Sequence, residues 1–151
     1  MNNRFKGVAL GLALTLAQPA GAQAPLDAKA LSQCAGMALR LRSESPELQR
    51  QAVNNNRQRQ ALSRQHAAID SGTDGDADRW LRYNAAAAAF NDHMARFRHA
   101  VVELNEVKQR YARGCAGRPY DNADLANLPL AEQQAMRAGL ADISVPYLAP
   151  R

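Results

Sequence analysis

The chain carries its large apolar residues at a spacing of seven through its second half. One register contains Tyr83, Phe90, Phe97, Leu104 and Tyr111, and a second, offset by three or four positions, contains Ala87, Met94, Val101, Lys108 and Cys115. Two such registers form an apolar stripe on a helix that packs against another helix. The pattern therefore predicts a long amphipathic helix from Trp80 to Cys115.

A second apolar pattern with the same period follows Asp27, a residue suited to capping a helix. Its registers contain Leu31, Ala38, Ser45, Ala52, Arg59 and His66, and Cys34, Leu41, Leu48, Asn55, Leu62 and Ile69. The seven-residue spacing continues in the same register beyond Pro46, and two interpretations of the helix at this proline are open. Either Ser45 caps a helix that restarts with Pro46 in its first turn, or one long helix continues through the proline with a kink.

The segment between the two patterns, Asp70 to Asp76, is dense in Asp, Gly and Ser, which are typical of a chain reversal. In a hairpin the residue numbers of facing positions have a constant sum, and pairing Cys34 with Cys115 centres the hairpin inside this segment. The same sum pairs Asn55, a polar seam residue suited to setting the register, with Met94. The patterns predict an all-α fold built on a long antiparallel coiled-coil hairpin.

We expect the hairpin to cover residues 23–118 and residues 119–151 to form a C-terminal segment. Within that segment, Leu130 to Leu140 has the spacing of a short helix. Small or apolar residues also flank the stripe of the second arm, at Ala86, Ala100 and Val107. A two-helix seam does not need them, so we expect a third surface on this arm: the C-terminal helix, a second protomer or a partner.

Residues 1–22 are typical of a signal peptide, because Arg4 and Lys6 precede an uncharged apolar stretch that ends in small residues before Gln23. That stretch is too short to span a bilayer, and Cys34 lacks the apolar context of a lipidation motif. Removal of the two basic residues lowers the formal net charge from +5 to +3. We therefore expect a periplasmic or secreted protein, a location that disfavours nucleic acid as a partner.

The two cysteines, Cys34 and Cys115, lie at the open end of the predicted hairpin. An even number of cysteines in an exported protein favours a disulfide. Closing a loop of this length stabilises a fold by about 4 kcal/mol in the chain-entropy model. A redox-active thiol is the alternative, but the chain has no Cys-x-x-Cys motif. The sequence thus predicts a disulfide that ties the two arms together.

The acidic turn is the nearest match to a ligand motif. Its aspartates occupy four positions of a calcium loop: Asp70, Asp74, Asp76 and Asp78. Two further ligand positions hold Gly72 and Leu81, where a calcium loop has oxygen ligands. The turn is therefore an incomplete calcium candidate, and a turn with helix-capping acids is the simpler interpretation.

Three arginines recur every seven residues on the outward face of the first arm: Arg50, Arg57 and Arg64. Such a stripe is suited to anionic lipid, lipopolysaccharide or an acidic partner. A solvated helix face is the simpler interpretation.

The chain shows no arrangement typical of catalysis. No Ser, His and acid are spaced as a triad, no paired carboxylates face a pocket, and a two-helix hairpin offers little concavity. The hairpin pairing places His66 beside Tyr83, remote from His93 and His99, so the histidines do not converge on one metal. We expect no enzyme, no metal site and no cofactor.

Asparagine follows an apolar seam residue at Asn84, Asn91 and Asn105, and the stripe leads into Cys115-Ala116-Gly117-Arg118-Pro119-Tyr120. Over Tyr83 to Tyr120 the chain resembles uncharacterised exported helical-hairpin proteins of Gram-negative bacteria, in which a coiled-coil arm ends in Cys-x-x-Arg-x-Tyr. The resemblance implies a location in the cell envelope and carries over no catalytic residue.

These patterns together predict a non-enzymatic interaction or scaffold protein of the cell envelope. Its working surface would be the widened stripe of the second arm, provided that the C-terminal segment leaves it open: Phe90, Phe97, Val101 and Leu104. Through this surface the chain would bind a protein partner or a second copy. The alternative is a ligand-responsive module that binds calcium at the acidic turn or an anionic envelope surface through the three arginines.

Overall fold

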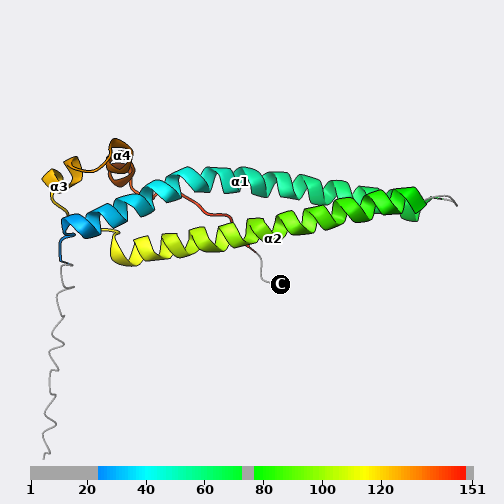
Figure 1. The fold of residues 1–151 in the computed structure, drawn as a ribbon, viewed down its shortest axis with the longest axis horizontal. Coiled ribbons are helices and arrows are strands. Elements are labelled where there is room, and N and C mark those ends of the chain that lie inside the picture. Colours follow the sequence, from blue (N-terminus) through cyan, green and yellow to red (C-terminus); the bar gives the residue numbers. More distant parts are fainter. Residues whose placement is uncertain (1–23, 73–76, 149–151) are drawn as a thin grey trace, which may run out of the picture.

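The computed structural model describes residues 24–72 and 77–148, so the predicted signal peptide and the turn residues Asp74 and Asp76 lie outside the described residues. The helices within those ranges are α1 (Ala28–Asp70), α2 (Ala77–Gly114), α3 (Asn122–Ala126) and α4 (Leu130–Ala138). The two long helices form an antiparallel hairpin, and the two short ones pack beside its open end (Figure 1). The predicted all-α hairpin with a short C-terminal helix is confirmed.

α1 runs without interruption for 43 residues through Pro46. It begins after Asp27, whose side chain accepts a hydrogen bond from the backbone nitrogen of Ala30 at 2.7 Å. A proline removes one backbone hydrogen bond and crowds the preceding turn. Ser45 and Leu48 are buried on either side of the exposed proline, so packing against α2 keeps the helix continuous. Of the two alternatives, the continuous helix is the one observed.

The register of the two arms agrees with the pairing read from the cysteines. Cys34 and Cys115 form the predicted disulfide, with their Cα atoms 5.7 Å apart. Close to the turn, the ring centroids of His66 and Tyr83 lie 5.3 Å apart, as the same pairing predicts. The two arms therefore keep one register from the open end to the tip.

Asn55, the buried polar residue of the seam, forms a hydrogen bond with the residue next to its predicted neighbour Met94. Its Oδ1 accepts a hydrogen bond from Nε2 of His93 at 2.8 Å. Asn55 is only 5% exposed. A buried amide needs hydrogen-bond partners, and a thioether is a weak acceptor with no proton to donate. The side chain therefore turns to the neighbouring imidazole.

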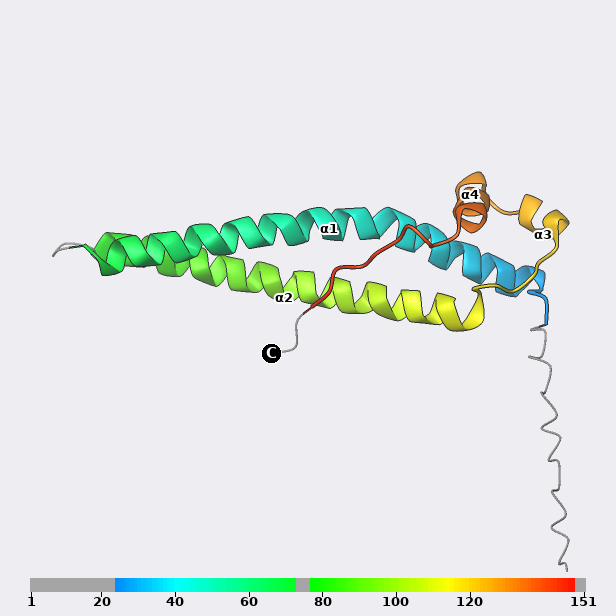
Figure 2. The ribbon, with the colours of Figure 1, turned by 180° about the vertical axis from the view of Figure 1, so that it is seen from behind.

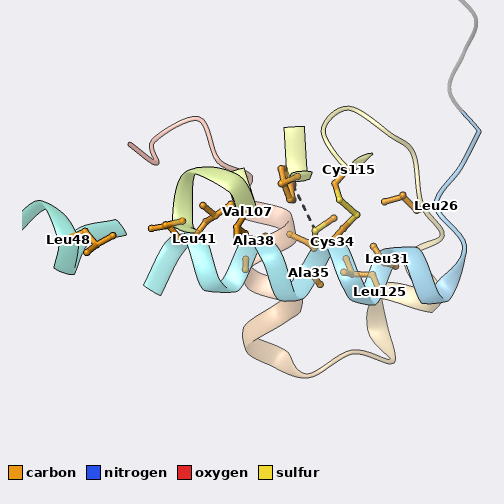
Figure 3. Packing of buried hydrophobic residues seen from close by; sticks show 14 of the residues in the cluster. Leu26, Leu31, Cys34, Ala35, Ala38, Leu41, Leu48, Val107, Cys115 and Leu125 are labelled. Atoms are coloured by element: carbon orange, nitrogen blue, oxygen red, sulfur yellow. Dashed lines mark hydrogen bonds between the residues drawn. A yellow bond between two sulfur atoms is a disulfide. The ribbon is translucent and has the colours of Figure 1, made fainter. Parts of the chain in front are cut away.

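The buried core lies mainly in the half of the hairpin nearest the disulfide, which we call the proximal half. There α1 and α2 bury a continuous set of seam residues: Leu31, Ala38, Leu41, Leu48, Phe97, Val101, Leu104, Val107 and Tyr111. Figure 3 shows Leu31, Ala38, Leu41, Leu48 and Val107 of this set. In residues 49–69 and 79–96, which we call the distal arm, only Asn55 and Ile69 are buried. The distal arm is therefore a two-helix coil with a half-open seam.

The short helices cover α1, whereas the sequence indicated cover on the second arm. Ala35, directly after the disulfide cysteine, is fully buried together with Leu125 of α3 and Ala135 of α4. A small side chain at this position lets a second element approach α1 closely. Met136 of α4 also reaches α2, where the Tyr111 hydroxyl donates a hydrogen bond to its Sδ at 4.0 Å. Burial raises the pKa of Tyr111, which keeps this phenol protonated.

Removal of the disulfide is expected to destabilise the hairpin. Replacing Cys34 and Cys115 by serine opens a loop whose ends are 81 residues apart in sequence. The free energy of unfolding should fall by about 4 kcal/mol, because the unfolded chain regains conformational freedom. Urea unfolding followed by circular dichroism measures the change, with Ala112→Ser on the exposed face of α2 as a control. A double variant as stable as the unaltered protein would contradict a stapling role.

Candidate interaction surface

The Cys-x-x-Arg-x-Tyr motif holds the segment before α1 against the end of α2. The guanidinium of Arg118 donates hydrogen bonds to the carbonyl oxygen of Ala24 at 2.9 and 2.7 Å and to that of Pro25 at 3.2 Å. The backbone nitrogen of Leu26 donates to the carbonyl oxygen of Pro119 at 2.8 Å. These are structural roles that the sequence alone did not assign.

An extended segment after α4, residues 139–148, crosses the hairpin, and we call it the strap (Figure 2). Its start is held by Arg42 of α1, which donates to the carbonyl oxygen of Gly139 at 2.8 Å. The same guanidinium donates to both carboxylate oxygens of Asp142, at 2.9 and 3.0 Å. A two-pronged contact of this kind fixes orientation as well as position.

The middle of the strap is held by polar side chains from both long helices. Gln49 of α1 donates to the carbonyl oxygen of Ser144 at 2.7 Å. Lys108 of α2 donates to the carbonyl oxygen of Ile143 at 3.2 Å. Apolar strap residues pack on the core beneath: Ile143, Val145 and Leu148. The strap therefore closes one side of the seam over the proximal half.

α1 and the strap occupy the surface that the sequence suggested for a partner. Phe97, Val101 and Leu104 are 5%, 0% and 0% exposed, and Phe90 is half-buried. The sequence prediction required that the C-terminal segment leave this stripe open. The three buried residues do not meet that requirement. A surface that uses the seam has to lie in the distal arm, where Phe90 is still accessible.

Three rings pack edge to face near the tip of the distal arm. The centroid of His66 lies 5.3 Å from those of Trp80 and Tyr83, which are 5.7 Å from each other. Such pairs add to the stability that burial of the rings supplies. Leu81, next along α2, is 70% exposed. The tip is thus held by aromatic contacts while apolar surface beside it remains in solvent.

One side of the distal arm carries an apolar groove. Its first section has a volume of about 530 Å³ and is lined by Ala61, Leu62, Ala86, Ala89 and Phe90 together with Gln58, Gln65 and His93. A second section of about 420 Å³ shares Gln65 and Ala86 with the first and extends to Ala68, Ile69 and Tyr83. We call the two sections the alanine groove.

The helical parts of the distal arm are rich in arginine. Residues 49–69 and 79–96 hold seven arginines and one acidic residue, Asp92, whereas the turn between them carries Asp70, Asp74, Asp76 and Asp78. Arg50 pairs with Glu47 at 2.5 Å, and within the described residues Arg57 and Arg64 are exposed and form no ion pair. The predicted arginine stripe is therefore present on the outside of α1.

The acidic turn remains a prediction as a calcium site. Asp70 lies 3.3 Å from Nδ1 of His66, and Asp78 lies in the first turn of α2. Asp74 and Asp76 lie outside the described residues. Within residues 24–72 and 77–148, no three His, Cys, Asp or Glu side chains gather where they could share a metal ion.

The fold and these surfaces define an all-α, disulfide-linked helical hairpin closed on one side by a C-terminal strap. Comparisons with protein-family models, curated proteins and solved structures find no significant match. They leave the resemblance to exported bacterial hairpin proteins as a prediction. In the described part of the chain, none of the helices combines the length and the apolar character that crossing a membrane requires.

Acid is expected to loosen the strap. The hydrogen bond from Arg42 lowers the pKa of Asp142, so its ionised form favours the closed strap. That contribution is present above about pH 4 and is lost as the pH falls further, through the lowered pKa. Asp142→Asn should raise amide exchange of Ile143 and Ser144 about two- to fivefold at neutral pH, as measured by NMR.

The matched control is Asp92→Asn, which alters a carboxylate on the distal arm and should leave strap exchange unchanged. The unaltered protein should approach the Asp142→Asn values as it is acidified. Equal exchange in the two proteins at neutral pH would show that the contact with Arg42 does not hold the strap.

Proposed function

We propose that this chain is a non-enzymatic interaction module of the periplasm or the extracellular space, and that its alanine groove binds an acidic helical segment of a partner protein. The observation that carries the proposal is the contrast between the two halves of the hairpin. The proximal half buries its seam under the strap and the short helices, whereas the distal arm leaves its seam half open.

The shape of the alanine groove supports a helix as its occupant. Ala61 of α1 and Ala86 and Ala89 of α2 line it, and side chains this small allow a third helix to approach closely. Leu62 and Phe90 supply the larger apolar contacts that a helix-in-groove complex uses as anchors. The groove follows α1 from residue 58 to residue 69, which is about 17 Å at helical rise.

The charge of the distal arm supports an acidic occupant. Away from the acidic turn, seven arginines outnumber one aspartate along its two helices, and complementary charge speeds association and selects partners. A second copy of the same arm would bring like charges together. An acidic helix is therefore favoured over self-association, although both would use the same apolar groove.

The disulfide supports the proposed compartment. Disulfides form and persist mainly in oxidising environments such as the periplasm and the extracellular space, and Cys34–Cys115 joins both cysteines of the chain. This agrees with the signal peptide predicted from residues 1–22. A rigid, stapled proximal half would then carry the distal arm as the binding element.

An anionic membrane surface is the second candidate ligand of the distal arm. Arg57 and Arg64 are exposed at heptad spacing with Arg50, so they form a stripe that could meet lipid headgroups. None of these three arginines lines the alanine groove. Helix binding needs the groove as well as the arginines, whereas vesicle binding needs the arginines alone, so a groove variant separates the two.

Binding of a defined peptide tests the proposal. The probe is a fluorescent amphipathic helix of about 18 residues with leucines on one face and glutamates elsewhere, and the mirror probe carries lysines instead. The disulfide-linked protein without residues 1–22 should bind the acidic probe more tightly than the basic one, with affinity that falls as salt rises. Ala86→Glu should weaken binding at least tenfold, because it adds bulk and negative charge inside the groove.

The control is Ala112→Glu, an equally exposed position on the proximal part of α2, which should change affinity less than twofold. Equal affinity for both probes, or no effect of Ala86→Glu, would overturn the proposal. Dimerisation in sedimentation equilibrium that Ala86→Glu abolishes would identify a second copy as the occupant instead. Binding to phosphatidylglycerol vesicles without peptide binding would identify the membrane surface.

A further inference from the structure

A second cavity lies on the other side of the hairpin, where the strap ends. It has a volume of about 490 Å³ and is bounded by α1, α2 and strap residues 146–148. Its apolar lining includes Phe90, Met94, Phe97 and Leu148. We call it the strap cavity. Asn56, which lines it, and Gln58, which lines the alanine groove, are two residues apart and so point to opposite sides of α1.

The polar lining of the strap cavity carries positive charge and neutral polar groups, the latter including the hydroxyl of Tyr147. Two arginines, Arg59 and Arg98, and three asparagine amides, Asn55, Asn56 and Asn91, line it. No acidic residue is among the lining residues. A cavity with cations on an apolar floor and no carboxylate of its own is electrostatically complementary to an anion that carries an apolar group.

Two of these donors lack a partner among the described residues. Asn55 accepts a hydrogen bond from His93 through Oδ1, but its buried Nδ2 has no acceptor. Arg98 is half-buried at the cavity and forms no ion pair or hydrogen bond within residues 24–72 and 77–148. Asn55 Nδ2 is fully buried, so Arg98 is the unpartnered group that an anion in the cavity can reach.

We infer that the strap cavity binds a carboxylate with an apolar chain, that is, a fatty-acid anion. The planar guanidinium of Arg98 offers two parallel N–H groups that match the two oxygens of a carboxylate. Arg59 adds a second positive charge to the lining from α1. The acyl chain lies over Phe90, Met94 and Leu148, which form the apolar lining. This inference does not depend on the proposed binding of a helix.

Calorimetry with decanoate, at concentrations at which it is monomeric, tests the site in the disulfide-linked protein without residues 1–22. Decanoate should bind with a stoichiometry of one, and decanol, which has the same chain without the charge, should bind at least tenfold more weakly. Arg98→Gln should reduce decanoate affinity by about tenfold or more, because it removes the positive charge and the two parallel N–H groups of the guanidinium. Arg98→Lys keeps the positive charge but not the paired N–H groups, so its affinity for decanoate should lie between that of the unaltered protein and that of Arg98→Gln.

Arg57→Gln is the matched control, since it removes an exposed arginine of α1 that does not line the cavity. It should change affinity less than twofold. An unchanged helical spectrum and thermal midpoint establish that Arg98→Gln is folded. Equal binding of decanol, unchanged affinity in Arg98→Gln, or uptake of many decanoate molecules per chain would overturn the inference and mark the contact as non-specific detergent binding.

Discussion

Two helices packed alone can bury only one stripe each, and the rest of this structure follows from that constraint. A long two-helix hairpin has little interior, so its stability depends on what is added to its sides. At one end the chain adds a disulfide, α3, α4 and the strap, and the seam there is fully buried. At the other end it adds nothing within the described residues except an aromatic cluster at the tip, and the seam stays half open.

The additions at the proximal end are held largely by polar side chains on the flanks of the seam. Arg42, Gln49 and Lys108 look like solvated helix-surface residues in the sequence, yet each donates to a backbone carbonyl of the strap. Arg118 does the same for the segment before α1. Apolar heptads build the hairpin, and polar donors at the neighbouring positions attach the chain ends to it.

The open distal arm combines features that do not help it to fold. Its arginines repel one another, its alanines bury little area, and Asn55 leaves a buried donor without an acceptor. Residues that lower the folding stability of a chain on its own are commonly residues that bind a partner or a ligand. The two cavities of this arm differ in chemistry, because one is lined mainly by alanine and aliphatic groups and the other by donors over aromatic and aliphatic groups.

The sequence by itself determined the hairpin, its centre, the disulfide and the contact of His66 with Tyr83. A seven-residue pattern is local, and the pairing of Cys34 with Cys115 selects one of the registers that two such patterns allow. It did not determine that α4 lies on α1, that the strap buries Phe97, Val101 and Leu104 together with α1, or that the strap cavity exists. Those features depend on where an irregular segment crosses two helices. The strap is held through backbone carbonyls, which every residue possesses, and through Asp142, whose partner Arg42 lies 100 residues earlier in the chain. No local pattern of side chains predicts such contacts, and only the tertiary structure decided them.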